Sequence, residues 1–356
     1  AYIATLTAEV PSTANAGEYA KIVSEKAMLR RLITAAEDIT IKGYDDKMAA
    51  EELLDYAEGD IFRIAQKRQR NDYAKIQDVL MKNLRIIDQA VQNKGQVIGL
   101  PTGFKQLDEK TSGLQPSDLI IVAARPGMGK TAFALNIAQQ SAVKAGASVL
   151  IFSLEMSQEQ LGQRLIAMQA RVESEKLKKG TLDLKDWDRI NFALNELNNT
   201  KIVIDDTPGI SIMEMRNKCR RLKAEQGLDL IVVDYLQLMT FDGRADSRQQ
   251  EISALSRHLK LLAREMNCPV IVLSQLSRAP ELRQDKRPMR SDLRESGSIE
   301  QDADIVMFLY RDDYYNENTE KPGVCEINIA KHRSGPTDRI DLTWVARYTK
   351  FSDKAL

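Results

Sequence analysis

The spacing of apolar residues changes at about residue 104, from helical periodicity to short apolar runs. Before that point, the stretch 17–39 carries apolar residues at helical spacing, namely Tyr19, Ile22, Val23, Leu29, Leu32 and Ile33. The stretch 45–66 has a similar pattern and is expected to form a partner helix. The sequence therefore predicts a helical hairpin with charged outer faces. Such a hairpin is equally consistent with a docking module and with plain packing in a small bundle.

A separate amphipathic helix is expected over 72–92. Its apolar stripe is made of Tyr73, Ile76, Leu80, Leu84, Ile87 and Val91, while lysine, arginine, aspartate and glutamine occupy the other faces. The following segment, 93–104, contains Gly95, Gly99, Pro101 and Gly103, which end the helix. The stripe must be buried either on the chain's own core or on a neighbouring subunit. The residues alone favour its own core.

From about residue 104 onward the pattern is that of an α/β domain. Apolar, β-branched runs recur at 119–124, 148–155, 201–206, 230–235, 269–275, 303–310 and 325–330. Helical segments separate the earlier runs, which predicts a mainly parallel sheet covered on both faces. The last runs follow one another closely, which predicts an antiparallel far edge. The expected domains are a helical hairpin over 1–70, a linker helix and hinge over 71–103, and an α/β domain over 104–356.

Composition narrows the class of protein. The 356 residues are enough for two domains, and lysine plus arginine equals aspartate plus glutamate at 51 each. This balance argues against a surface coated with basic residues but not against a narrow basic channel. No run approaches the length of a membrane span, and the start has no signal-peptide pattern. Three scattered cysteines and two histidines argue against a disulfide framework or a zinc cluster, so we expect buried thiols, no membrane partner and a cytoplasmic location. Because the chain starts without methionine, we expect it to be part of a longer protein.

The strongest motif is ARPGMGKT, residues 124–131, which follows an apolar run and opens a helical segment. This strand, loop and helix order is that of a P-loop, in which backbone N–H groups wrap a phosphate. We therefore predict that ATP and Mg²⁺ are bound here, with Lys130 on the phosphates and Thr131 on the metal. Ala124 stands where the first glycine of the motif is usual, and it is small enough to follow the strand closely. The predicted nucleotide contacts are Gly127, Met128, Gly129, Lys130, Thr131 and Ala132.

Three further polar residues end apolar runs. Asp234 ends 230–235, where its carboxylate would lie beside the P-loop and hold Mg²⁺ through a water. Glu155 is the last residue of the run 148–155 and would polarise the attacking water. Gln275 ends 269–275, where its amide would sense the γ-phosphate and pass that signal to the next loop. A solvated strand end is the alternative for Glu155 taken alone.

Basic residues are concentrated after two of these runs. Arg244 and Arg248 follow the first, and Arg278, Arg283, Lys286, Arg287, Arg290 and Arg294 follow the second. Such loops would neutralise the phosphates of single-stranded DNA, and Gly297 would allow close approach of the backbone. Aromatic residues are absent from the second loop, so base stacking is not expected there. The alternative is a solvated loop with balanced charges.

Lys331 and Arg333 alternate late in the chain, so both should point to one face of a strand while His332 points to the other. If that face meets the P-loop of a neighbouring subunit, the two cations can stabilise charge on the γ-phosphate. The alternative is a surface strand with ordinary charges.

Together these motifs resemble the DnaB family of bacterial replicative helicases. The residues ARPGMGKT, SLEM, VVDYLQLM, LSQLSR, RESGSIEQDAD and KHRSG occur in the order and spacing of that family, and the resemblance covers about residues 72–350. It implies a RecA-like core and a homohexameric ring that moves 5′ to 3′ on single-stranded DNA at the replication fork. It also implies a nucleoid-associated location, a helicase loader, and primase recruited by the N-terminal helices, whose earlier part would be missing.

The resemblance also implies roles for single residues. Lys130 and Thr131 match nucleotide ligands, Glu155 the catalytic base, Asp234 the Mg²⁺-associated acid, and Arg164 a nucleotide-contacting arginine. Lys331 and Arg333 match a pair acting on the neighbouring subunit, while Arg294, Glu295 and Gly297 match contacts to the DNA backbone. The 72–92 helix is then expected to dock on the adjacent subunit rather than on its own core.

Two alternatives stay open from the sequence. A RecA-type recombinase would share the core and the basic loops but form filaments, and a signalling or scaffold ATPase would lack a DNA role. The helical N-terminal module and the Pro/Gly hinge favour the helicase over the recombinase.

Overall fold

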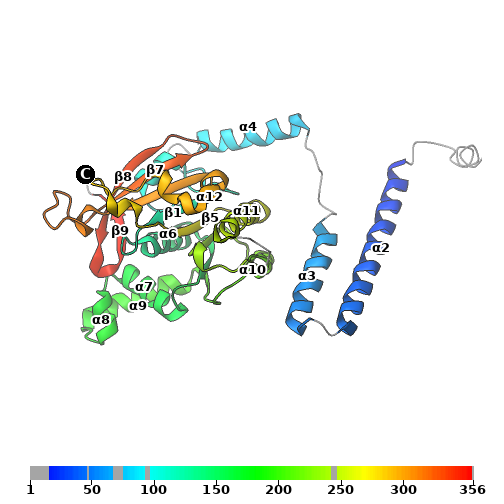
Figure 1. Ribbon diagram of the computed structural model, residues 1–356, viewed down its shortest axis with the longest axis horizontal. Coiled ribbons are helices and arrows are strands. Elements are labelled where there is room, and N and C mark those ends of the chain that lie inside the picture. Colours follow the sequence, from blue (N-terminus) through cyan, green and yellow to red (C-terminus); the bar gives the residue numbers. More distant parts are fainter. Residues whose placement is uncertain (1–15, 46–47, 67–74, 93–96, 242–246, 355–356) are drawn as a thin grey trace, which may run out of the picture. The chain divides into compact units, whose positions relative to one another are not determined.

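The computed structural model describes residues 16–45, 48–66, 75–92, 97–241 and 247–354 (Figure 1). Two compact units divide the chain, one over residues 1–89 and one over residues 90–356. The first unit holds α2 (Ala16–Asp45), α3 (Ala50–Gln66) and most of α4 (Ile76–Gln92). None of the described helices is both long enough and apolar enough to cross a membrane.

The predicted helical hairpin is confirmed, because α2 packs against α3. Its polar contacts centre on Asp38, whose carboxylate accepts hydrogen bonds from the Tyr56 hydroxyl at 2.5 Å and from Lys42 at 2.9 Å. The Lys42 ammonium also lies 3.6 Å from the centre of the Tyr56 ring. These exposed hydrogen bonds lower the pKa of Asp38. The three side chains tie the two helices together at one level of the hairpin.

The linker helix α4 begins at Ile76, four residues later than the pattern suggested. Its apolar stripe is exposed where the structure describes it: Ile76, Leu80, Leu84 and Ile87 keep 54–70% of their surface accessible. Tyr73 and the side chain of Val91 lie outside the described residues. Within the first unit, the stripe is therefore not buried.

The second unit is built on one nine-stranded sheet in the order β3-β2-β4-β5-β1-β6-β7-β8-β9. Strands from β3 to β6 run parallel, whereas β7, β8 and β9 are antiparallel, as the closely spaced last runs predicted. The strands are β1 (Leu119–Ala124), β2 (Ser148–Ser153), β3 (Lys201–Asp205), β4 (Leu230–Asp234), β5 (Val270–Gln275), β6 (Ile305–Tyr310), β7 (Val324–His332), β8 (Asp338–Val345) and β9 (Lys350–Asp353).

The remaining helices flank this sheet (Figure 1). They are α5 (Lys105–Thr111), α6 (Lys130–Ala145), α7 (Gln158–Ala170), α8 (Ser174–Lys179), α9 (Leu184–Asn198), α10 (Ile212–Gln226), α11 (Arg248–Met266) and α12 (Gly297–Asp302). Short 3₁₀ turns lie at Leu236–Leu238 (η2), Ala279–Leu282 (η3), Arg290–Ser296 (η4), Asp312–Tyr314 (η5) and Ala346–Tyr348 (η6).

Alternate residues of each central strand face two separate cores, as expected for a sheet covered on both faces. In β1, Ile120 and Val122 belong to the core beneath α6 and α7, while Leu119 and Ile121 belong to the core beneath α10 and α11. A small third cluster joins α7 to α9. This arrangement confirms the predicted α/β class with a mainly parallel sheet.

The strands β8 and β9 were not predicted from the sequence. In β8 only Ile340 and Leu342 alternate as buried residues, and β9 has four residues with Phe351 as its buried member. Such short runs carry little periodic signal, and their pairing depends on contact with β7 rather than on local pattern.

The three cysteines are free and buried, in agreement with the expectation of buried thiols. Burial raises the pKa of the Cys268 and Cys325 thiols to about 12.

The two-sided core gives a direct stability prediction. Phe308 on β6 is completely buried among the residues beneath α11, whereas Phe192 on α9 is 66% exposed. We expect Phe308→Ala to lower the free energy of unfolding by about 3–5 kcal/mol, because it removes a large side chain from a close-packed core. The matched Phe192→Ala change should cost less than about 0.5 kcal/mol in the isolated chain. Urea unfolding measures both, and equal losses would contradict the assignment of the core.

Candidate active site

The P-loop connects β1 to α6 through two glycines in the left-handed region, Gly127 at φ 80° and Gly129 at φ 97°. A side chain at Gly127 would also meet the Tyr314 ring at 2.8 Å, so both conformation and space require glycine there. Gly129 is the N-cap of α6 and provides no side-chain cap. The first N–H groups of α6 therefore point from the positive end of a helix toward the loop, which is the arrangement that binds a phosphate.

Lys130, the first residue of α6, is half-buried. Burial lowers the pKa of its ammonium, and the negative charges of Asp234 and Glu155 act in the opposite direction. Its nitrogen lies 5.6 Å from the centre of the Tyr235 ring. An ammonium that is partly withdrawn from water and faces two carboxylates is placed to meet the negative charge of a nucleotide.

Asp234 is 3% exposed, and neither of its carboxylate oxygens makes a hydrogen bond of good geometry with a described residue. Burial raises the pKa of this carboxyl group, while the nearby Thr131 hydroxyl lowers it. A buried carboxylate without hydrogen-bond partners, beside a threonine hydroxyl, fits the oxygen ligands that Mg²⁺ requires. Thr131 and Asp234 are therefore the residues suited to hold the ion, directly or through water.

Four strand ends meet around this point because the strands are parallel and in register. Ser153 of β2 pairs with Asp234 of β4, and Ala124 of β1 pairs with Gln275 of β5. Although β5 lies between β4 and β1, the Asp234 carboxylate lies beside Thr131 of the P-loop, the position expected from the sequence. The peptide bond that follows Asp234 is cis.

The other residues predicted to act on the nucleotide of the same subunit are Glu155, Gln275 and Arg164. Glu155 lies two residues beyond β2 and is exposed, and Gln275 is exposed at the tip of β5. Arg164, on α7, is half-buried. Burial lowers the pKa of the Arg164 guanidinium, while Asp234 and Glu155 raise it. The charges of Asp234 and Glu155 thus act on both Lys130 and Arg164, at the edge of the sheet where the parallel strands end.

The structure adds residues that no motif singled out. The Arg125 guanidinium donates to both carboxylate oxygens of Glu281, at 2.9 and 3.1 Å, and to the Leu276 carbonyl at 2.8 Å. Arg311 donates to the carbonyl of Gly127 at 3.4 Å. These bonds hold the P-loop against the segments that follow β5 and β6. Only the packing of distant segments brings these groups together, so no local sequence signal identifies them.

Two of the arginines predicted to contact DNA are engaged with buried carboxylates. Arg283 donates to Asp292 at 2.6 Å, and Arg287 makes two hydrogen bonds to Glu326, at 2.8 and 2.9 Å. The Arg287 guanidinium also lies over the Tyr310 ring at 4.7 Å. Arg283 therefore holds the loop after β5 in its own shape, whereas Arg287 fixes that loop to β7 of the domain.

Lys286 also lies against an aromatic ring, because its ammonium is 4.7 Å from the centre of the Tyr315 ring. The DNA contacts predicted for Arg294, Glu295 and Gly297 concern side-chain positions outside the described residues, although their backbone forms part of η4 and the start of α12. Arg244 also falls outside the described residues.

Lys331 and Arg333 hold the end of α12 within their own chain. The Lys331 ammonium donates to the carbonyls of Gln301 at 3.2 Å and Ala303 at 2.8 Å, and also to that of Glu300. The Arg333 guanidinium donates to the Gln301 carbonyl at 3.0 Å and to the Asp304 carboxylate at 3.4 Å. Burial, and then the charge of Arg333, lower the pKa of Lys331. Both cations thus lie on one side of β7, as predicted from their alternation.

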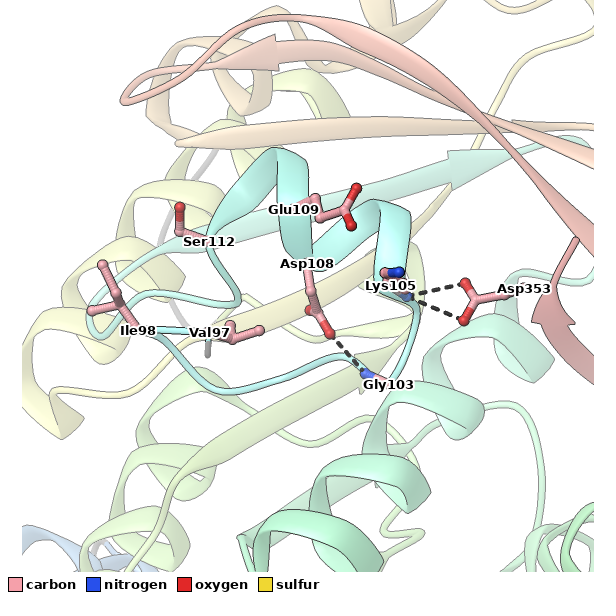
Figure 2. Close-up of a pocket in the computed structure, with 8 residues that line it drawn as sticks. All are labelled: Val97, Ile98, Gly103, Lys105, Asp108, Glu109, Ser112 and Asp353. Atoms are coloured by element: carbon pink, nitrogen blue, oxygen red, sulfur yellow. Dashed lines mark hydrogen bonds between the residues drawn. The ribbon is translucent and has the colours of Figure 1, made fainter. Parts of the chain in front are cut away.

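A separate cavity of about 500 Å³ lies near the N-terminal end of the second unit, where Val97, Gly103 and Lys105 line it together with Asp353 (Figure 2). Two of its carboxylates accept hydrogen bonds from backbone: the Gly103 N–H donates to Asp108 at 3.3 Å, and the Lys105 N–H donates to Asp353 at 3.0 Å. None of the residues predicted to bind nucleotide or DNA contributes to it.

The fold and the site define a RecA-like P-loop nucleotide-binding domain, and comparisons with known proteins specify it further. Residues 99–353 match the family profile of the DnaB-like helicase C terminal domain. The chain is 52% identical over 351 residues to "Replicative DNA helicase DnaC" of Bacillus subtilis, covering 98% of this chain and 77% of that protein. It is 51% identical to "Replicative DNA helicase DnaB" of Geobacillus stearothermophilus, with the same coverage. The chain therefore belongs to the DnaB-like helicase family.

Solved structures agree with this assignment. One solved structure, described as an ATPase domain, superposes with a TM-score of 0.76 at 41% identity, covering 80% of this chain and all of that one. Another, described as "The Structure Of A DnaB-Like Replicative Helicase And Its Interactions With Primase", superposes with a TM-score of 0.83 at 38% identity, covering 99% of this chain and 83% of that one. The RecA-like fold predicted from the sequence is thus confirmed.

The pairing of Arg287 with Glu326 predicts a pH-dependent contribution to stability. Hydrogen bonds from Arg287 and then Lys321 lower the pKa of Glu326 to about 2, against the opposing effect of burial. Because the pKa of Glu326 in the folded protein lies below its ordinary value of 4.5, the ionised carboxylate stabilises the folded state at pH values above 4.5. This contribution is lost as the pH falls from 4.5 toward 2. We expect Glu326→Gln to lower the free energy of unfolding by about 3 kcal/mol at pH 7.

Urea unfolding between pH 7 and pH 2 checks this expectation. The gap between wild type and Glu326→Gln should narrow steadily below about pH 4.5, because the wild-type glutamate takes up a proton. Glu317→Gln, at an exposed position, serves as the control and should leave the curve unchanged. A gap that stays constant across this range would contradict the assigned pair.

Proposed function

We propose that this chain is an ATP-hydrolysing replicative DNA helicase. One observation carries the proposal: the uncapped N-terminus of α6, which carries Lys130 and Thr131, lies beside the buried carboxylate of Asp234. The charges of Asp234 and Glu155 act on both Lys130 and Arg164. The chain's relatives are named replicative DNA helicases, and they match it over nearly its whole length. A site of this kind, in this family, serves ATP hydrolysis coupled to the unwinding of DNA.

Each residue of the site has a proposed task. The backbone N–H groups from Gly127 to Ala132 cradle the phosphates, and Lys130 neutralises them. Thr131 and Asp234 hold Mg²⁺, which when bound neutralises charge on the phosphate oxygens. Glu155, exposed at the mouth of the site, orients and polarises the attacking water. Arg164 contacts the nucleotide, and Gln275 detects the γ-phosphate.

Lys331 and Arg333 act on the nucleotide of a neighbouring subunit in this proposal. In the single chain they donate mainly to backbone carbonyls at and just after the end of α12, and Arg333 also pairs with Asp304 at 3.4 Å. A negatively charged phosphate can replace the contacts to the carbonyls. Leu80, Leu84 and Ile87 of α4 are exposed within the first unit, which is compatible with burial of this stripe on a neighbouring subunit. We propose a homohexameric ring in which α4 docks on the adjacent subunit.

Single-stranded DNA would pass along the loops that follow β4 and β5. Arg283 and Arg287 support these loops through Asp292 and Glu326, so their contribution to DNA binding is partly offset by the carboxylates. The exposed Arg278, the half-buried Lys286 and the backbone around Arg294, Glu295 and Gly297 are then the proposed phosphate contacts. Backbone contact without base stacking suits a motor that moves over any sequence.

Further partners are proposed from the likeness to the family. One similar structure is described as a DnaB-like replicative helicase with its interactions with primase. We propose that the α2–α3 hairpin contributes to the corresponding contact here, and that a helicase loader assembles the ring on DNA. The proposed site of action is the bacterial cytosol, at the nucleoid.

The two alternatives are disfavoured for specific reasons. A RecA-type recombinase shares the core, but the relatives named above are helicases. A scaffold ATPase without a DNA role would not need the basic segment after β5. Closed six-fold rings in electron micrographs, rather than helical filaments, would support the helicase over the recombinase.

Replacement of Lys130 tests the proposed function directly. We expect Lys130→Ala to reduce ATP hydrolysis at least about 100-fold, in line with the loss of a preorganised charge contact to the transferring phosphoryl group. Unwinding of a forked duplex should disappear while the mass of the assembled particle is retained. Lys144→Ala, at the exposed end of the same helix, is the matched control and should behave as wild type. Unwinding by the Lys130→Ala variant would refute the proposal.

Mixed assemblies test whether Arg333 works across the subunit interface. We expect Arg333→Ala alone to bind nucleotide normally but to lose turnover by about 10³-fold. Mixing it with Lys130→Ala subunits creates some interfaces that have both residues intact. Partial recovery of hydrolysis in the mixture is therefore expected, and its complete absence would argue that Arg333 acts within its own subunit or not at all.

A further inference from the structure

One side chain bridges the ends of two strands at the candidate active site. Gln237 lies in η2, three residues after Asp234, and is half-buried. Its amide nitrogen donates to the Ser274 hydroxyl at 3.0 Å and to the Gln275 carbonyl at 3.2 Å. Its amide oxygen accepts from the Gln275 N–H at 3.4 Å. The side chain therefore pairs with the backbone of Gln275 much as a neighbouring strand would.

The backbone of the same residue is attached to a third element. The Arg248 guanidinium, in the first turn of α11, donates to the Gln237 carbonyl at 2.6 Å. Arg248 is itself paired with Glu251 one turn further along α11. Gln237 thus connects the tip of β5 to the beginning of the helix that follows the first basic loop.

The two β5 residues that Gln237 contacts, Ser274 and Gln275, face opposite sides of the sheet. Ser274 is in register with Ala123, which faces the core beneath α11, so Gln275 faces the phosphate side. Ser274 is 1% exposed, and Gln237 donates to its hydroxyl within that buried setting. A displacement of the Gln275 backbone on the phosphate side is therefore passed to Gln237, and from there to Arg248 on the α11 side.

We infer that Gln237 is a positioning residue that couples the strand end carrying Gln275 to the start of α11, and thereby couples nucleotide state to the basic loops on DNA. The inference rests on the proposed function, because it takes Gln275 as the group that meets the γ-phosphate. Gln237 itself does not touch the nucleotide. Its loss should impair communication between the two sites rather than the chemistry at either one.

The test compares Gln237→Met, which keeps length and removes every side-chain hydrogen bond, with wild type in the full chain. Steady-state ATP hydrolysis is measured without DNA and with a poly-dT oligonucleotide. We expect kcat and KM without DNA to stay within about 2-fold of wild type, and the stimulation by DNA to fall by about 5- to 100-fold, the range of an ordinary allosteric coupling. The ratio of oligonucleotide affinities with a non-hydrolysable ATP analogue and with ADP should approach one.

Two further variants sharpen the result. Ser274→Ala removes one of the three interactions and should lower DNA stimulation less than Gln237→Met does. The double variant should be no worse than Gln237→Met alone, because both changes break the same link. Gln226→Met is the matched control: Gln226 donates to Ser148 at 3.5 Å, at the opposite end of the sheet. It should leave DNA stimulation unchanged.

The outcomes separate the inference from the proposed function. Wild-type hydrolysis that does not respond to DNA would overturn the proposed coupling to DNA and the inference with it. A responsive wild type with an equally responsive Gln237→Met variant would overturn the inference alone. Loss of hydrolysis without DNA in Gln237→Met and in Ser274→Ala would also overturn it, since Gln237 would then serve the site itself.

Discussion

The parallel alignment of β2, β4, β5 and β1 is the constraint on which the site depends. Because these strands run in one direction and pair in register, their carboxyl ends meet at one edge of the sheet. Glu155, Asp234, Gln275 and the P-loop each follow one of those ends. The two cores above and below the sheet hold the strands in place, so the polar groups at the edge can stay incompletely paired. Asp234, buried without hydrogen bonds of good geometry, is the clearest case.

The charged residues around this edge divide into two kinds. Arg125 and Arg287 are engaged with carboxylates and fix the segment after β5 to the P-loop and to β7, while Arg283 pairs with Asp292 inside that segment. Lys331 binds backbone carbonyls at the end of α12, and Arg333 binds one such carbonyl as well as the buried Asp304. A contact to a carbonyl can be exchanged for another partner more readily than a buried carboxylate pair. A motor needs both kinds, because fixed loops transmit force and exchangeable contacts let the assembly change state. Gln237 adds an uncharged link between the end of β5 and the start of α11.

Much of the fold and of the nucleotide site was predictable from local pattern. Seven strands, the helical hairpin and the P-loop were all predicted, because alternation, helical spacing and glycine position are local properties. The short strands β8 and β9 were missed, since two buried residues such as Ile340 and Leu342 make a weak pattern. The pattern did not predict that β5 lies between β4 and β1, because the order of the strands along the chain does not give their order in the sheet.

The sequence by itself determined the chemistry of the site: which residues carry charge, where glycine permits a left-handed backbone, and which strand ends are polar. These depend on residue type and near neighbours. Only the tertiary structure determined which partner each charged side chain contacts. Arg287 and Lys286 are adjacent in the chain, yet one is locked to the buried Glu326 and the other lies over the Tyr315 ring. That difference arises from strands far apart in the chain, whose packing sets the partner and the exposure of each side chain.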